Sequence, residues 1–143
     1  MRIPARVRYA VRILAEIGQN PGKPVPLPEV EKMQRISAKF AKQILQPLVE
    51  KRIVAAKRGI KGGYYLLRKP SAIRIKNVAD ALGEKSKFVP CLEKGKACDR
   101  EKACGAKRKW AELQGLVEAF FAKTTIQDFI DQERAAKRTP PGR

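Results

Sequence analysis

The sequence predicts a mainly α-helical chain that carries one small β-hairpin. Three observations support this fold class. Apolar residues recur at helical spacing near both ends, two short helices flank a tight connection, and two strand-like runs enclose a Gly-rich basic loop. A hairpin directly after a helix-turn-helix forms the wing of a winged helix. We therefore expect a winged helix-turn-helix followed by a long C-terminal dimerisation helix.

The first predicted helix lies near the N-terminus, with Pro4 in its first turn and Gly18 at its end. Several arginines lie on its polar side. Its apolar stripe consists of Ile3, Val7, Ala10, Val11, Leu14 and Ile17.

The helix-turn-helix is expected next. Its first helix should begin near Leu27 or Pro28 and run to about Met33. Its second helix should begin at Ser37, a good N-cap residue, after a tight connection at residues 34–36. Pro47 lies inside the apolar stripe of this second helix and should kink the helix or shorten it.

The wing is predicted from the strand-like runs at residues 53–56 and 64–67, which flank a basic loop. Gly62 or Gly63 should take the positive φ that this turn needs. A short helix is then expected at residues 77–82, ending at Gly83.

The C-terminal part predicts a long amphipathic helix from about Ala106 to Lys123, then a short helix capped by Thr124 or Thr125. The apolar residues of the long helix are Trp110, Leu113, Val117, Phe120 and Phe121. This stripe exceeds what one small winged helix needs, which favours pairing with a second chain over packing on its own domain. The expected organisation is a DNA-binding domain at 1–83, a cysteine-bearing loop at 84–105, dimerisation and final helices at 106–132, and a disordered basic tail at 133–143.

The charge of the chain points to a polyanionic partner. The 143 residues carry a formal charge of +18, and residues 32–69 alone contain eleven basic residues and one acidic residue. Nucleic acid is the leading candidate, and an anionic membrane surface is the alternative. We expect no membrane insertion and a cytoplasmic location, because the sequence has no long apolar run and no signal peptide.

Candidate DNA-binding residues lie in the second helix of the motif, in the wing and near the N-terminus. Gln can bond adenine, Lys can bond guanine or phosphate, and Arg at a hairpin tip can enter a minor groove. The alternative is an ordinary helical pair with a solvated charged face. The candidates are Ser37, Lys39, Phe40, Lys42 and Gln43, with Arg58 and Lys61 in the wing and Arg2 and Arg8 at the N-terminus.

A further candidate site is a cluster of three cysteines. Cys91, Cys98 and Cys104 are the only cysteines, and the chain has no histidine. A closed structural zinc site needs four thiolate or imidazole ligands, which one such chain cannot supply. A cubane iron–sulfur cluster can bind three cysteines and leave its last iron to a weak or exchangeable ligand. The alternatives are three free thiols or a site that has lost its ligand function.

These motifs together resemble a known family. Residues 1–4 (MRIP), 8–11 (RYAV) and 58–66 (RGIKGGYYL), with three cysteines before Trp110, are similar to the winged-helix regulators typified by IscR, NsrR and RirA. The resemblance covers about residues 1–132. It implies a homodimeric transcription factor whose cysteines hold a 2Fe-2S or 4Fe-4S cluster. It also implies control of genes for iron–sulfur assembly, iron, sulfur or nitrosative stress.

The chain departs from this family pattern at two positions. Lys107 stands where the IscR-like members carry a histidine, and Arg8 stands where the NsrR-like members use an aspartate. A protonated lysine is a poor ligand, so a small molecule, water or a carboxylate such as Glu93, Asp99 or Glu101 remains for the fourth position. The missing histidine favours a 4Fe-4S over a 2Fe-2S cluster. It also leaves open a cluster-free function, as in cysteine-metabolism repressors of similar fold.

The resulting hypothesis is a cytoplasmic homodimeric regulator that represses or activates transcription from a palindromic operator and senses iron, redox or nitrosative state through its cluster. One alternative keeps the DNA binding and replaces the cluster by thiol oxidation or a protein partner. Another is a basic RNA- or ribosome-associated protein. An enzyme is not expected, because the sequence has no histidine, no phosphate loop, no evident acid–base pair and no C-x-x-C pair.

Overall fold

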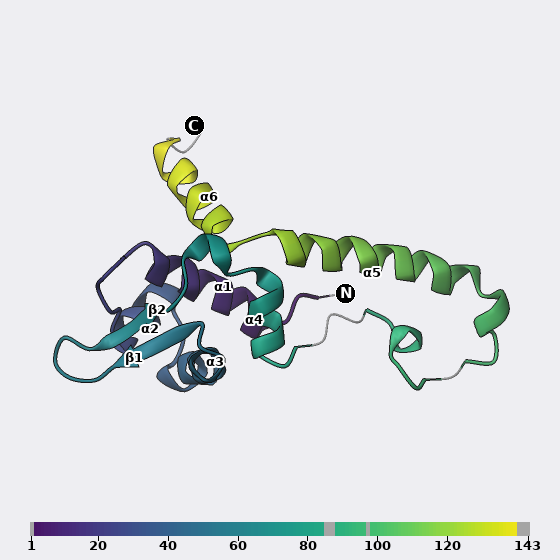
Figure 1. Cartoon of the computed structure of the whole chain (residues 1–143), viewed down its shortest axis with the longest axis horizontal. Helices are drawn as coiled ribbons and strands as arrows, with labels where there is room; N and C mark the ends of the chain where they lie inside the picture. Colours follow the sequence, from purple (N-terminus) through teal and green to yellow (C-terminus); the bar gives the residue numbers. More distant parts are fainter. Residues whose placement is uncertain (1, 85–87, 97, 140–143) are drawn as a thin grey trace.

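The computed structural model describes residues 2–84, 88–96 and 98–139. Helices α1–α4 and one hairpin form a compact body, from which α5 extends as a long arm while α6 leaves at another angle (Figure 1). This arrangement confirms the predicted mainly helical chain with a hairpin wing. The elements are α1 (Ala5–Gly18), α2 (Leu27–Gln34), α3 (Ala38–Glu50), β1 (Val54–Lys57), β2 (Gly63–Leu66), η1 (Pro70–Ala72), α4 (Ile75–Ala81), η2 (Pro90–Leu92), η3 (Glu101–Ala103), α5 (Gly105–Lys123) and α6 (Ile126–Arg138).

Helix α1 is the central element of the core. Seven of its residues are buried, including Ile13 and Ala15, which the predicted stripe did not contain. Such a wide apolar face is typical of a helix covered by neighbours on several sides. Ile3, in contrast, precedes the helix and is 48% exposed, because α1 begins after Pro4.

The helix-turn-helix forms as expected from its local signals. The hydroxyl of Ser37 accepts a hydrogen bond from the Phe40 N–H at 3.2 Å, so Ser37 is the N-cap of α3. Arg35 adopts a left-handed conformation with φ of 53° and ends α2. The expected shortening at Pro47 does not occur, since α3 continues to Glu50.

The wing is an antiparallel hairpin in which Val54 pairs with Leu66 and Lys57 pairs with Gly63. A further bridge joins its second strand to the loop before α2, where the backbones of Val25 and Tyr64 exchange two hydrogen bonds of 2.8 Å. The predicted positive φ is found at Gly63, with a value of 151°, and not at Gly62. A Cβ on Gly63 would overlap the carbonyl group of Val25, so this bridge requires glycine.

Gly63→Ala is therefore expected to lower the free energy of unfolding by roughly 2 kcal/mol or more, because the wing must move away from Val25. Urea unfolding followed by circular dichroism measures this loss. Gly59→Ala is the matched control. Gly59 has φ of 109°, but a Cβ added there would meet no atom within 4 Å, so this variant should lose less stability. Equal stability of the Gly63 variant and the parent would contradict the close approach.

The C-terminal helices are tied to α4 at their junction. The Ile75 N–H donates to the Thr124 carbonyl at 3.0 Å, and the Ile126 N–H donates to the Ile73 carbonyl at 2.8 Å. The first of these bonds helps α4 begin at Ile75, two residues earlier than expected. Thr125 caps α6 as one of the two predicted residues, and its N–H and hydroxyl lower the pKa of Asp128.

The basic tail expected to be disordered from residue 133 is helical through Arg138. The first part of α6 packs against α1, where Gln19 Nε2 donates to Glu133 Oε2 at 2.9 Å, and its residues 134–138 are exposed. Residues 140–143 of that predicted tail lie outside the described residues. Within the described ranges, no helix has the length and apolar character needed to cross a bilayer.

Candidate DNA-binding face and cysteine segment

Helix α3 presents one apolar and one polar face. Ala41, Ile44, Leu45 and Leu48 are buried against the body, which leaves the opposite side of the helix to solvent. Ser37, Lys39, Lys42 and Gln43 are all exposed. The helix thus offers a polar and basic surface at its N-terminal half, where recognition helices contact base edges.

Phe40 behaves differently from the other candidate residues of α3. Its ring meets the Tyr9 ring edge-on, with centroids 5.5 Å apart and an interplanar angle of 86°. It is half-buried and packs against the hydrophobic core. Its spacing to Ile44 and Leu48 places it on the apolar face of α3, where it contacts Tyr9 of α1.

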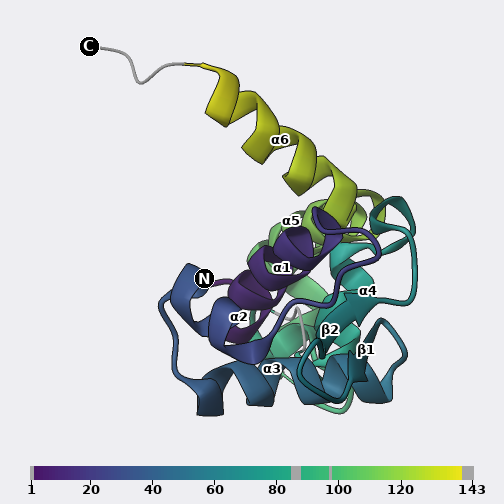
Figure 2. The same cartoon turned by 90° about the vertical axis from the view of Figure 1, so that its left-hand side faces the viewer.

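The wing carries its charged residues at an exposed turn. Arg58, Ile60 and Lys61 are all exposed, and Ile60 is fully so, with a relative exposure of 105%. Figure 2 shows α3 and the hairpin on the same side of the body, with α6 leaving on the opposite side. The structure therefore brings the α3 and wing candidates onto one side of the molecule.

The two N-terminal candidates, Arg2 and Arg8, are also exposed. Arg8 Nε donates to the Ile3 carbonyl at 3.3 Å and so holds the chain that precedes α1. Arg12, one turn further on, lies over the Tyr9 ring with 5.2 Å between the guanidinium carbon and the ring centroid.

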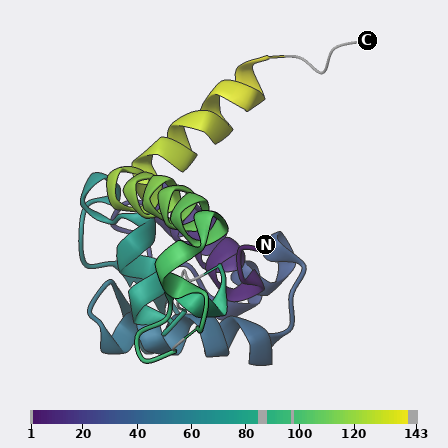
Figure 3. The same ribbon diagram turned by 90° about the vertical axis from the view of Figure 1, so that its right-hand side faces the viewer.

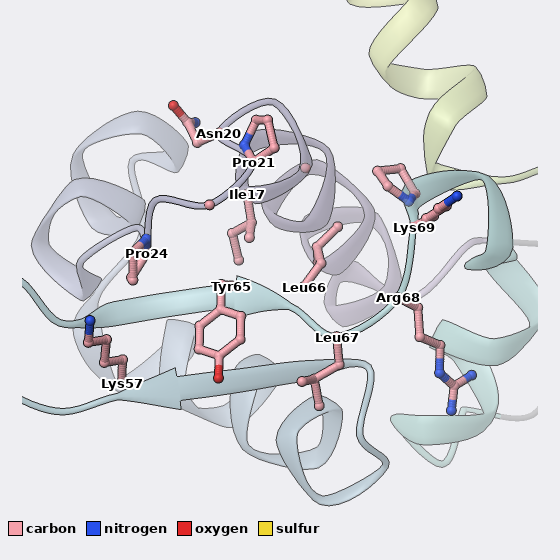
Figure 4. A pocket seen from close by; sticks show the side chains of 13 residues that line it. Ile17, Asn20, Pro21, Pro24, Lys57, Tyr65, Leu66, Leu67, Arg68 and Lys69 are labelled. Carbon is pink, nitrogen blue, oxygen red and sulfur yellow. The ribbon is translucent and has the colours of Figure 1, made fainter.

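A basic hollow that the sequence did not suggest lies beside the wing. It has a volume of about 860 Å³ and is formed by the loop after α1, strand β2 and the segment that follows it (Figure 4). The charged side chains in its wall are Lys57, Arg68 and Lys69, all of them basic. Tyr65 and Leu67 add exposed apolar surface. The basic surface of this domain thus extends past the hairpin.

The cysteine segment connects α4 to α5 and lies along the first half of α5 (Figures 1 and 3). Phe88 fixes its beginning, because its N–H donates at 3.2 Å to Oε1 of Gln114, a residue of α5 that is only 4% exposed. All three cysteines are free thiols. Cys91 and Cys104 are half-buried and Cys98 is exposed.

Cys104 caps the N-terminus of α5, since its Sγ accepts a hydrogen bond from the Lys107 N–H at 3.4 Å. Lys107 Nζ forms a hydrogen bond and an ion pair with Glu101. This hydrogen bond, helped by the nearby Cys91 and Cys98, raises the pKa of Lys107. The residue is therefore an ammonium ion at neutral pH, which suits a counter-charge and not a metal ligand.

The donor set of this segment fits a soft metal centre, because three thiols lie in one short segment. The segment does not gather them, however. Among the described residues, no three Cys, Asp or Glu side chains form a group that could hold a metal ion. Metal sites on loops commonly form only as the loop closes around the metal. The chemistry fits a cluster, and the segment would have to close for all three thiols to reach it.

Helix α5 exposes large apolar side chains along its length. Trp110 is 46% exposed, Phe120 is 50% exposed, and Leu116, which the predicted stripe omitted, is 70% exposed. Leu113, Val117 and Phe121 are half-buried. A continuous exposed apolar face of this kind is typical of an interface with another chain.

The helix-turn-helix, its wing and their exposed basic residues define a winged-helix DNA-binding protein. The chain belongs to the Rrf2 family, described as iron-dependent transcriptional regulators, whose pattern matches residues 3–132. This result confirms the resemblance found in the sequence and makes the protein a transcriptional regulator.

Two kinds of relatives are similar to this chain. IscR of Sodalis glossinidius is an HTH-type transcriptional regulator and is 30% identical over 134 residues, covering 93% of this chain and 81% of that protein. The structure of CymR, the global cysteine regulator of B. subtilis, has a TM-score of 0.75 at 25% identity and covers 92% of this chain and 98% of CymR. IscR of T. potens has a TM-score of 0.76 at 22% identity, covers 99% of this chain and 94% of that one, and supports the fold alone. The named relatives are regulators of transcription, not enzymes.

Proposed function

We propose that this protein is a homodimeric regulator that binds a palindromic operator and senses iron, redox or nitrosative state through an iron–sulfur cluster. One observation carries the proposal. All three cysteines of the chain lie as free thiols in the segment that joins the DNA-binding body to the exposed helix α5. A sensor in this segment would be linked to both the DNA-binding domain and the proposed dimerisation helix α5. The proposed setting is a reducing cytoplasm, which keeps such thiols available.

In this proposal the exposed side of α3 enters the major groove. Gln43 and Lys42 reach base edges, while Ser37 and Lys39 contact the backbone. Arg58 and Lys61 of the wing contact the adjacent groove or phosphates, and Arg2 and Arg8 add phosphate contacts. Phe40 supports α3 from the inside, because its ring packs on Tyr9.

Cys91, Cys98 and Cys104 would hold the cluster, with 4Fe-4S favoured over 2Fe-2S because no histidine is available. A bound cluster of this kind supplies reactivity toward oxygen, nitric oxide and iron shortage. Lys107 is not the fourth ligand, since it is protonated and paired with Glu101. Its charge instead balances the thiolates. The last coordination position is left to water, a small molecule or a carboxylate such as Glu93 or Asp99.

Anaerobic purification tests the cluster directly. We expect a brown protein with broad visible absorption and with iron and acid-labile sulfide in equal amounts. The triple Cys→Ala variant, purified in parallel, is the control and should contain neither. A colourless, iron-free parent protein from iron-replete cells would contradict the cluster assignment.

A second candidate function is a cluster-free regulator that senses through its thiols or through a partner protein. The similarity to CymR and the exposure of Cys98 favour it. In that case the iron-free parent should still bind duplex DNA, and thiol oxidation or the partner should change its affinity. An RNA-associated protein would instead prefer single-stranded RNA over every duplex.

The salt dependence of DNA binding tests the basic face. Binding to duplex DNA should weaken steeply with salt, because each neutralised phosphate contributes about 0.9 to the slope of log affinity against log salt. Lys39→Gln removes a proposed backbone contact and should reduce that slope by roughly one per subunit. Lys137→Gln is the matched control, because Lys137 is an exposed lysine of α6 on the far side of the body and should leave the slope unchanged. Equal slopes for all three proteins would show that DNA does not bind at the exposed face of α3.

A further inference from the structure

Helix α3 contains a proline in its interior, and the structure shows how the resulting gap is filled. Pro47 has no N–H, so the carbonyl of Gln43 lacks its usual partner four residues later. Arg6 of α1 supplies the missing donor, since its Nη2 lies 3.2 Å from the Gln43 oxygen. The guanidinium therefore takes the place of the absent amide within α3.

The same guanidinium also binds the end of α4. Its Nη1 donates to the carbonyl of Leu82 at 3.2 Å and lies 3.5 Å from Oε1 of Glu84. Leu82 is the C-cap of α4, and Glu84 stands at the entrance to the cysteine segment. One side chain of α1 thus joins α3 to the end of α4.

The placement of Arg6 is not optimal for stability alone. Its Nε is buried and has no hydrogen-bond partner among the described residues. An unpaired buried donor is unfavourable and offsets part of what the other contacts contribute. A planar guanidinium with several donors is nevertheless the side chain that can bind carbonyl groups of two separate helices at once.

We propose that Arg6 is a positioning residue for DNA reading, which fixes the backbone of α3 at Gln43 relative to the end of α4. This inference rests on the proposed function, in which the Gln43 side chain reads a base edge. The carbonyl that Arg6 holds belongs to that same residue, so a shift at this carbonyl displaces the reading side chain directly.

Base discrimination is the measurement that tests this role. One duplex is selected by the parent protein from a random-sequence library. The second duplex differs from it at one base pair, the one at which Gln43→Ala loses the base preference of the parent. Binding is followed by fluorescence anisotropy, at a temperature where circular dichroism shows every variant folded. Arg6→Ala and Arg6→Lys should each reduce the ratio of the affinities for the two duplexes by about tenfold, which is near the lower end of the discrimination that one good base contact provides. Arg134→Ala removes an exposed arginine of α6, on the opposite side of the body, and should keep the parent ratio.

Pro47→Ala provides a rescue that a merely structural role does not predict. It restores the N–H that can bond the Gln43 carbonyl within α3, so Arg6→Ala in that background should retain most of the discrimination. An Arg6→Ala protein that keeps the parent ratio would overturn the proposal, whatever its melting temperature. An equal loss with and without Pro47→Ala would overturn it as well. A parent protein that binds every duplex alike would instead overturn the proposed function on which this role rests.

Discussion

Replacing any one of Cys91, Cys98 or Cys104 with Ala should reduce the iron content of the protein to background. Three ligands from one chain leave no spare donor, and the chain has no histidine that could replace a thiolate. Iron, acid-labile sulfide and visible absorption of anaerobically purified protein give the measurement. Lys94→Ala, which changes an exposed residue of the same segment, is the control and should keep its iron.

The cysteine variants should remain folded, which separates loss of the cluster from loss of the protein. The hydrophobic core is formed by α1–α4, the hairpin and α6, and none of its buried residues belongs to the cysteine segment. Cys104→Ala removes the cap hydrogen bond to the Lys107 N–H, a loss of about 1 kcal/mol or less. Thermal unfolding should therefore stay close to that of the cluster-free parent. Full iron content in the triple variant would refute the assignment of these ligands.

Much of the fold could be predicted because its signals are local. Ser37 caps α3 through its own side chain, and Thr125 caps α6. Each of these residues acts within a few positions of itself, so the sequence alone reveals it. The early start of α4 and the bridge at Val25 depend on hydrogen bonds to distant segments, and a local pattern does not contain that information.

The candidate site shows the same division. Clustered thiols and a basic helix with a basic wing are visible in the composition of short segments. The role of Arg6 is not, because the carbonyl that it binds is 37 positions away along the chain. Phe40 is a candidate for DNA contact by its place in α3, yet its spacing to Ile44 and Leu48 also puts it in the apolar stripe of that helix. The ring packs on Tyr9, as this spacing indicates.

Phe120→Asp should convert the proposed dimer into a monomer and weaken operator binding by roughly 30-fold or more. The Phe120 side chain is half exposed on α5 beside Leu116, and burying a carboxylate at that position against a second chain is strongly unfavourable. A palindromic site needs two recognition helices about 34 Å apart, so a monomer loses the gain from binding both half-sites. Light scattering after size exclusion gives the mass, and anisotropy with the selected duplex gives the affinity.

Ala111→Asp is the matched control for this prediction. It adds the same charge to the same helix at an exposed position, but about 180° round the helix axis from Phe120, on the opposite side of α5. The control should keep the parent mass and affinity if the dimer forms through the apolar face of α5. A Phe120→Asp protein with unchanged mass and affinity would show that α5 does not hold the two chains together. A parent protein that is monomeric at micromolar concentration would exclude the dimer altogether. Trp110, Leu116 and Phe120 of α5 would then be exposed to solvent without a partner chain.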